Sequence, residues 1–174
     1  MAVLSRECHG RDWRGCRVLL EIAKSVTLDQ PTDTVWEIVR VPETVAACLP
    51  NIREFERQGE GATYAATIED KLGPFKVEVP VTIEVGEDTQ DRRMTANVAG
   101  NDKRGQARVR GEVAASVVAT DGGSVLELTS RIEVLGRLAT LGAVPMRRRA
   151  DQIFDVFVRN LSARLSAPTS GPDH

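Results

Sequence analysis

The stretch FKVEVPVTIEV, residues 75–85, alternates an apolar side chain with a polar side chain or a proline at every step. Successive side chains of a β-strand point to opposite faces, so this period of two predicts a strand with one dry face and one wet face. Such a strand is typical of an antiparallel sheet that buries one face only. Pro80 falls on the wet face, and because proline lacks an N–H we expect an edge strand or a bulge there.

The same pattern extends outward from this stretch and predicts six to seven antiparallel strands. Toward the N-terminus, residues 52–58 and 62–70 have the pattern of two strands joined by a turn, and residues 18–28 have that of a first strand. Toward the C-terminus, small or apolar residues recur at every second position within 94–98 and 107–117, and Leu126, Leu128, Ile132 and Val134 are expected to point inward on the last strand. Asp121-Gly122-Gly123 predicts a tight hairpin turn between the last two of these strands.

Helical signals occur after the first predicted strand and near the C-terminus. Pro31 predicts the start of a short helix with Thr32 or Asp33 as its cap, and Pro42 opens a second short helix that Pro50 closes. From about residue 135 the apolar period becomes helical again, and Pro145 is expected to kink or start a long helix. The apolar face of this predicted helix comprises Leu138, Leu141, Ile153, Phe154, Phe157, Val158, Leu161 and Leu165.

This order of elements predicts an α+β fold in which a curved antiparallel sheet wraps a long C-terminal helix, with two short helices after the first strand. A sheet with one apolar face must bury it, and the long amphipathic helix is the available cover. A strongly curved sheet that cannot collapse fully onto one helix leaves an apolar cavity. We expect one domain at 18–166, a poorly ordered extension at 1–17 and a flexible tail at 167–174.

The charge balance and the cysteine content narrow the class of protein. Lys plus Arg is 23 and Asp plus Glu is 25, so no nucleic-acid partner is expected, although an exposed basic patch is compatible with this balance. No signal peptide and no apolar segment of roughly 20 residues is apparent. Three cysteines do not make a disulfide framework, and a cytoplasmic location is expected.

The distribution of histidine argues against acid–base or metal chemistry in the core. His9 and His174 are the only histidines, and both lie in the predicted tails. The group Cys8, His9 and Cys16 matches no strong zinc spacing, and no phosphate-binding loop is present. We therefore predict no catalytic residue, no metal site and no tightly bound cofactor.

Two basic runs have two interpretations each. Arg147-Arg148-Arg149 could meet a partner, an anionic lipid surface or an acidic group of a ligand, but a solvated helix edge is favoured. A second run on alternate outer positions is interpreted as a solvated strand face because acidic residues interleave; it comprises Lys103, Arg104, Arg108 and Arg110.

Inward-facing apolar and aromatic side chains are the candidates for a cavity lining, because pockets for lipophilic ligands are mostly apolar. Each one alone is also compatible with plain core packing. The predicted ligand-binding residues are Leu49, Tyr64, Phe75, Val77, Met94, Ala96, Val98, Leu128, Met146, Ile153, Phe154 and Phe157.

Four segments together resemble the CoxG family, the G-type accessory proteins of carbon monoxide dehydrogenase, within the START/Bet v 1-like (SRPBCC) ligand-binding superfamily. The segments are QPTDTVWEIVRVPETVAACLPNI (30–52), YAATIEDKLGPFKVEVPVTIEV (64–85), AGNDKRGQARVRGEV (99–113) and VLGRLATLGAVPMRRRADQIFDVF (134–157). The most specific feature is the ordered spacing of Gly73-Pro74, Gly100, Gly105, Gly136 and Gly142. The resemblance covers about 18–165, but this chain has Val41-Pro42 and Pro50-Asn51 where the family typically has Asp-Pro and Pro-Gly.

The resemblance implies a helix-grip fold and an accessory protein that holds a hydrophobic small molecule, quinone-like or lipid-like. It further implies a molybdenum hydroxylase as partner, in electron-acceptor delivery or enzyme recruitment to the membrane, with peripheral contact at the inner face. Two other hypotheses stay open. Tyr64, the only tyrosine, is the best residue for a cyclase or dehydratase on this fold, and an assembly factor would act through protein contacts alone.

Overall fold

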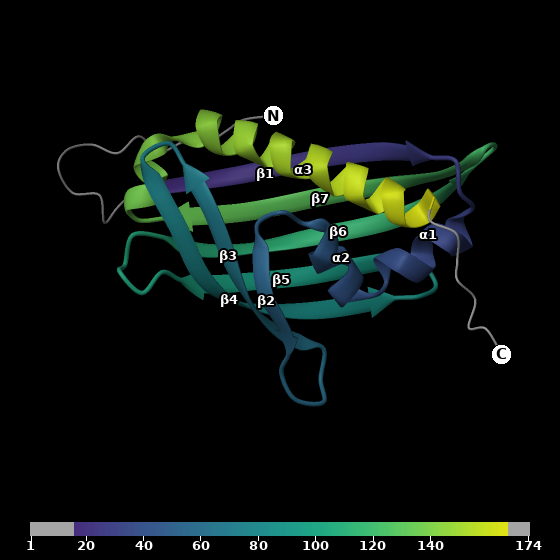
Figure 1. Ribbon diagram of the computed structural model, residues 1–174, viewed down its shortest axis with the longest axis horizontal. Helices are drawn as coiled ribbons and strands as arrows, with labels where there is room; N and C mark the ends of the chain where they lie inside the picture. The colour runs from purple at the N-terminus through teal and green to yellow at the C-terminus, as the bar shows by residue number, and fades with distance from the viewer. Residues whose placement is uncertain (1–15, 167–174) are drawn as a thin grey trace.

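The computed structural model describes residues 16–166, in which a curled antiparallel sheet of seven strands is closed by one long helix (Figure 1). The strands are β1 (Arg17–Leu28), β2 (Ile52–Arg57), β3 (Thr63–Leu72), β4 (Phe75–Asp88), β5 (Arg93–Asn101), β6 (Arg108–Thr120) and β7 (Gly123–Leu135). The helices are α1 (Thr32–Val39), α2 (Pro42–Cys48), the 3-10 helix η2 (Arg137–Leu141) and α3 (Ala143–Ser166). The predicted α+β class, strand number and pair of short helices are confirmed. The predicted extension 1–17, except its last two residues, and the tail 167–174 lie outside the described residues.

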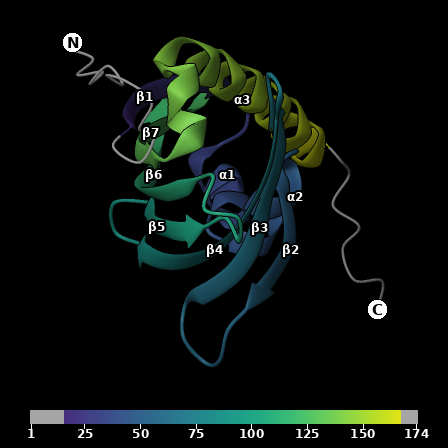
Figure 2. The same cartoon turned by 90° about the vertical axis from the view of Figure 1, so that its left-hand side faces the viewer.

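The sheet is a meander in which β2 to β7 each pair with their neighbours in sequence, and β1 joins the far edge beside β7. The strand order is β1-β7-β6-β5-β4-β3-β2. Figure 2 shows the sheet curling from β1 round to β2, with α3 lying across the opening. The inner face of the sheet therefore looks at one side of α3, as the alternating pattern of the strands requires.

The two ends of the sheet differ in what covers them. At one end the β3–β4 turn and the β5–β6 loop meet η2 and the start of α3; we call residues 71–76, 102–108 and 136–148 the turn end. At the other end α1 packs beside the β4–β5 and β6–β7 turns, and α2 continues from α1 toward α3 and β2; we call residues 29–49, 87–93 and 120–123 the helix end.

The helices begin differently from the sequence prediction. The N-cap of α1 is Pro31 itself, with no side-chain capping hydrogen bond, so the predicted capping role of Thr32 or Asp33 is wrong. Asp33 instead pairs with Arg92 of the β4–β5 turn. The apolar residues from 138 to 141 belong to η2 rather than to the long helix, because Gly142 separates the two with a φ of 79°. Pro145 lies in the first turn of α3, where its missing N–H costs no helical hydrogen bond.

Pro80 lies in β4, which is an interior strand, and β3 pairs through this position without a register shift. The predicted edge strand or bulge is therefore wrong. However, β5 pairs with β4 only from Val81 onward, so residues 75–80 have no neighbour on that side. The Pro80 carbonyl oxygen points toward the β5 side of β4, because a Cβ on Gly100 of β5 would lie 2.1 Å from it. The nitrogen of the same residue points to the same side, where pairing with β5 has not yet begun. A residue without an N–H is tolerated there because no ladder hydrogen bond is lost.

Candidate functional site

The inner face of the sheet packs tightly at both ends and less tightly in the middle. One core cluster, at the turn end, contains buried Val18, Val79 and Val134 together with Met146 of α3. A second cluster, at the helix end, contains buried Trp36, Leu126 and Leu161 among others. Both clusters include side chains from the sheet and from α3, so the helix is anchored to the sheet at each of its ends.

Between the two clusters runs a row of inner-face residues, one from each of five adjacent strands. The strand registers place them directly opposite one another, and all five are half-buried; they are Ile22, Ser130, Val113, Ala96 and Val85. The next row toward the turn end continues the pattern with half-buried Ile132, Gly111, Val98 and Ile83. We call these nine residues the middle band.

The face of α3 mirrors this distribution. Met146 is buried near the start of the helix and Phe157 and Leu161 are buried toward its end, whereas Ile153 and Phe154 between them are half-buried. Water therefore reaches the middle of both layers, although each layer faces the other. A packed core would bury these apolar side chains completely.

The twelve predicted ligand-binding residues are distributed over both clusters rather than brought together in one lining. Those in or against the turn-end cluster are Phe75, Val77, Val98 and Met146, and those in or against the helix-end cluster are Leu49, Met94, Leu128 and Phe157. Tyr64 is buried outside both clusters, and the remaining three, Ala96, Ile153 and Phe154, are half-buried around the middle band. Their role in ligand binding stays a prediction.

Two ion pairs hold α3 to opposite sides of the curled sheet, to β1 and to β3. On one side Lys24 of β1 lies 2.7 Å from Asp151, and its ammonium lies 5.8 Å from the centre of the Phe154 ring. On the other side the Arg149 guanidinium makes a bidentate contact with Asp70 of β3, through Nε at 3.0 Å and Nη2 at 2.9 Å. Because the Asp70 side chain is only 9% exposed, this second pair is the better shielded from water.

Arg149 therefore corrects the interpretation of the triple arginine run as a solvated edge, since its charge is used inside the molecule. Sequence reasoning missed this because Asp70 lies 79 residues away. It also missed Lys24 and Ser130, which occupy inner-face positions. Each is a polar residue within a series of alternate apolar residues, Ile22-Lys24-Val26 and Leu128-Ser130-Ile132. That interruption is the sequence signal that could have identified them as polar groups on the inner face.

One buried polar group of the helix-end cluster has no hydrogen-bond partner. The Nε1 atom of Trp36 is the only side-chain nitrogen or oxygen among residues 16–166 that is buried without a hydrogen-bond partner. Trp36 is 4% exposed and belongs to the helix-end cluster. A buried unpaired donor costs about 1–3 kcal/mol, so an acceptor at this atom would be stabilising.

Burial affects two titratable groups. Burial raises the pKa of the Cys48 thiol above its ordinary value of 9.0, and the Arg164 guanidinium opposes this rise. Burial also raises the pKa of the Tyr64 phenol above 10.0; the Glu43 carboxylate raises it further, while Arg57 lowers it. The Tyr64 ring stacks on Phe55, with centroids 4.7 Å apart. Both groups keep their protons at neutral pH.

A separate open depression of about 460 Å³ lies beside β2, where the register of β2 and β3 shifts between Arg53 and Glu56. Its lining includes the carboxylates of Glu54 and Glu56, and Glu54 accepts a hydrogen bond from Thr67. Its lining is mixed, because Ala65, Ala66, Pro80 and Val81 stand beside the two carboxylates, so it suits an apolar ligand less well than the middle band does.

Metal and membrane-spanning features are absent from the described part of the chain. Residues 16–166 contain no group of three or more His, Cys, Asp or Glu side chains placed to hold a metal ion. Over the same residues, no helix has the length and apolar character needed to cross a membrane.

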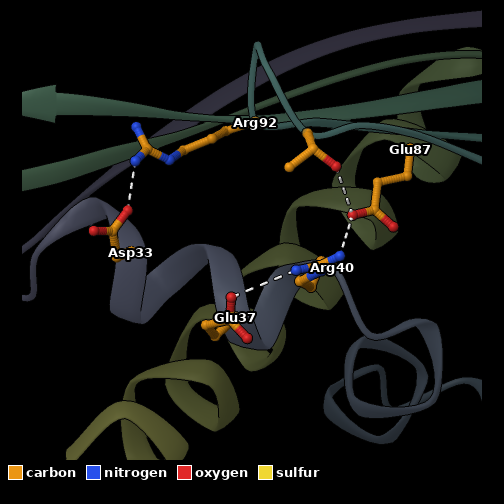
Figure 3. Close-up of polar contacts among 6 residues, drawn as sticks. Asp33, Glu37, Arg40, Glu87 and Arg92 are labelled. Atoms are coloured by element: carbon orange, nitrogen blue, oxygen red, sulfur yellow. Dashed lines mark hydrogen bonds and ion pairs between the residues drawn. The ribbon is translucent and has the colours of Figure 1, made fainter.

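Both ends of α1 carry ion pairs, which together form a small charged network at the helix end (Figure 3). Arg40 pairs with Glu87 at 2.7 Å and with Glu37 at 3.5 Å, and Arg92 pairs with Asp33. The network joins α1 to the β4–β5 turn and so covers the helix-end cluster from outside.

Comparison with known proteins places this geometry in a family. The model of the family described as the carbon monoxide dehydrogenase G subunit (CoxG) matches residues 25–166. No curated protein sequence matches the chain.

Several solved structures share the fold at low sequence identity. A conserved protein from Geobacillus kaustophilus is 21% identical with a TM-score of 0.74, covering 84% of this chain and 95% of that one. Truncated norcoclaurine synthase from Thalictrum flavum is 15% identical with a TM-score of 0.61, covering 88% and 97%. Ara h 8.0201 is 12% identical with a TM-score of 0.58, covering 84% and 97%. These likenesses confirm the predicted START/Bet v 1-like helix-grip fold. Because the sequence identities are this low, they show the fold and nothing about function.

Proposed function

Because this chain belongs to the CoxG family of carbon monoxide dehydrogenase accessory proteins, we propose that it binds a hydrophobic small molecule between α3 and the inner face of the sheet. The observation that carries the proposal is the middle band. Apolar side chains from five strands face the half-buried middle of α3 and stay open to water, while both ends are packed. A ligand in this position would remove that apolar surface from water.

The chemistry of the surroundings favours a lipophilic ligand with few polar atoms. Within the middle band, Ser130 is the only residue with a polar side chain, and Lys24 next to it is already paired with Asp151. Trp36 Nε1 is a buried donor that lacks an acceptor. A ligand that extends from the middle band into the helix-end cluster would supply one through a carbonyl oxygen, so we propose a quinone-like molecule, with a lipid as the alternative of the same apolar class.

The family description suggests where such a ligand would go. We propose that the chain serves a molybdenum hydroxylase of the carbon monoxide dehydrogenase type, either delivering an electron acceptor or recruiting the enzyme to a membrane. The protein would then be a carrier, and the redox chemistry would belong to its partner.

Tyr64 supports a second candidate function, an enzyme of the cyclase or dehydratase type. Burial, reinforced by the Glu43 carboxylate, raises the pKa of its phenol, which could donate its proton to a bound substrate. The carrier remains the leading proposal because the middle band contains no titratable side chain.

Binding can be measured with the protein's own fluorescence. Trp13 and Trp36 are the only tryptophans, so Trp13→Phe leaves Trp36 as the single emitter. We expect menaquinone to quench this emission in a saturable way, and native mass spectrometry to show a complex with one molecule bound. A mass that stays free of adduct after incubation with menaquinone and with phospholipid would contradict the carrier and favour an assembly factor.

A pair of matched variants locates the site. Ala96→Phe fills the middle band from β5, whereas Ala99→Phe places the same ring at an exposed position of the same strand. We expect the first to weaken binding at least about tenfold and the second to leave it within about twofold. If both variants keep the circular dichroism of the unmodified protein and weaken binding equally, the ligand does not bind at the middle band. Conversion of the ligand, lost in Tyr64→Phe, would establish the enzyme instead.

A further inference from the structure

The turn end carries a concentration of positive charge that ligand binding does not explain. Its three segments contain eight basic residues and one acidic residue, Asp102. The formal net charge of the whole chain is -2, so this is a local feature of one end. The eight are Lys71, Lys76, Lys103, Arg104, Arg108, Arg137, Arg147 and Arg148.

The fold brings these three segments together from distant parts of the chain. The Leu138 N–H of η2 donates to the Gln106 carbonyl in the β5–β6 loop at 3.0 Å. The Arg137 guanidinium lies 5.7 Å from the centre of the Phe75 ring, next to the β3–β4 turn. Gly136, which directly precedes η2, has a φ of 95° and lies close to the β5–β6 loop. Any larger residue would be too close there, because its Cβ would lie 2.9 Å from the Gln106 carbonyl oxygen. Thus η2 packs between both loops, as the left side of Figure 1 shows.

None of these eight cations forms an ion pair within the described residues. Asp102, the one acid of the turn end, accepts the backbone N–H of Arg104 at 2.9 Å. Directly beside this end, Arg149 does have an acidic partner in Asp70. Like charges gathered without counter-charges repel one another, so ion pairing does not stabilise the fold at this end, and the arrangement suits an external polyanion.

The same end exposes an apolar side chain among its cations. Val144, at the start of α3, is 70% exposed, more than the other large apolar side chains that reach the surface, Val41 at 38% and Val118 at 45%. Exposed Pro145 follows it, and Arg147 and Arg148 lie within the next turn. A phosphate backbone alone gives no reason for an apolar residue here, whereas a bilayer offers acidic headgroups over an apolar interior.

We propose that the turn end is a docking surface for an anionic lipid bilayer, with the eight cations at the headgroups and Val144 inserted between them. The surface lies beside the turn-end core and away from the charged network of α1, so docking leaves the helix end free. The inference deepens the membrane recruitment proposed above, because it names the surface that would carry it, and it rests on that part of the proposed function. It does not depend on the chain binding a hydrophobic ligand.

Vesicle co-sedimentation of the full chain tests this surface. We expect binding to vesicles of phosphatidylcholine mixed with phosphatidylglycerol, little binding to phosphatidylcholine alone, and release at about 1 M salt, where the screening length is about 3 Å. Each cation near an anionic surface contributes roughly fivefold to partitioning, so Arg137→Gln/Arg147→Gln/Arg148→Gln should weaken binding by about 100-fold.

A matched triple variant changes the net charge equally at other places. Arg53→Gln/Arg93→Gln/Arg131→Gln removes three exposed cations outside the turn end and should change binding by less than about threefold. Val144→Ser should weaken binding by about fivefold with no change of charge. Equal losses in both triple variants, equal binding to neutral vesicles, or binding to single-stranded DNA in place of vesicles would overturn the proposal. Ligand binding, followed by Trp36 fluorescence without vesicles, should be unchanged in all three variants.

Discussion

The helix end and the turn end are built from similar parts, sheet turns covered by short helical segments, yet they use charge differently. The helix end has eight acidic and three basic residues, and two of its ion pairs, Arg40–Glu87 and Arg92–Asp33, join α1 to the β4–β5 turn. The turn end has eight basic residues without an ion pair among the described residues. The charges of the helix end therefore contribute to holding the molecule together, and those of the turn end are available to something outside it.

The contrast extends to exposed apolar groups. At the helix end the most exposed large apolar side chain is Val41 at 38%, whereas at the turn end Val144 is 70% exposed. If one end supplies stability and the other supplies recognition, substitutions at the two ends should separate these properties.

The largest expected effect comes from the helix-end cluster. Leu161→Ala removes a completely buried side chain and should lower the free energy of unfolding by about 3 kcal/mol, measured by urea denaturation. Val144→Ala at the turn end should change it by less than about 0.5 kcal/mol. Similar losses in both variants would remove the distinction between the two ends.

Asp70 lies at the border of the turn end, and its substitution tests the ion pair with Arg149. Asp70→Asn should lower stability by about 2 kcal/mol, because it leaves the partly buried Arg149 without its bidentate partner. Its neighbour Glu69 pairs with Arg53 at the surface, and Glu69→Gln should cost less than about 0.5 kcal/mol in the same urea titration. A small effect of Asp70→Asn would mean that α3 does not depend on this clamp.

Alkaline pH should weaken the molecule through the helix end and its neighbourhood. Burial raises the pKa of Cys48 and of Tyr64 above 9.0 and 10.0, so the unfolded chain loses these protons first. Their stabilising contribution is complete below those values and is lost as the pH rises through the higher folded pKa values. Cys48→Ala and Tyr64→Phe should each flatten the decline of stability between neutral and alkaline pH, measured by urea denaturation at several pH values. A decline unchanged in the double variant would assign it to other groups.

The smallest effect concerns the surface pair Arg92–Asp33. A double-mutant cycle with Arg92→Ala and Asp33→Ala should give a coupling energy of about 0.5 kcal/mol, reduced further at high salt. A coupling above about 1.5 kcal/mol would show that the network in Figure 3 is a principal tie of α1 to the sheet. Thermal unfolding at low and high salt gives an independent measurement of the same pair.

The strands and the long helix could be predicted from the sequence because their signal is local. The alternation over 75–85 depends only on neighbouring residues, and it placed the inner face of β4 correctly. Strand order is not local, and for that reason Pro80 was predicted at an edge although β4 is interior. Its position is explained only by where β5 begins to pair.

The candidate site was less predictable for the same physical reason. Alternation indicates which residues face inward, but it does not show whether an inward residue is packed, like Val77, or open to water, like Ala96. That difference depends on the height of α3 above the sheet, which the clamps at Lys24 and Arg149 help to set. The basic surface was also hidden, because its cations come from three segments that only the fold brings together.

The pairing of β1 with β7 has a consequence for how the chain is made. Every other strand pair joins neighbours in sequence. In contrast, Arg17 cannot pair until Leu135 has been synthesised, and Leu28 cannot pair until Ser124 has been synthesised. At a synthesis rate of about 5–20 residues per second, this delay is roughly 5 to 25 s. During that time the ribosome presents β1 as an apolar strand with no partner, while the hairpins from β2 onward form behind it. The first strand to be synthesised is therefore the last to find its pairing partner. We expect chaperones to bind this segment during the delay.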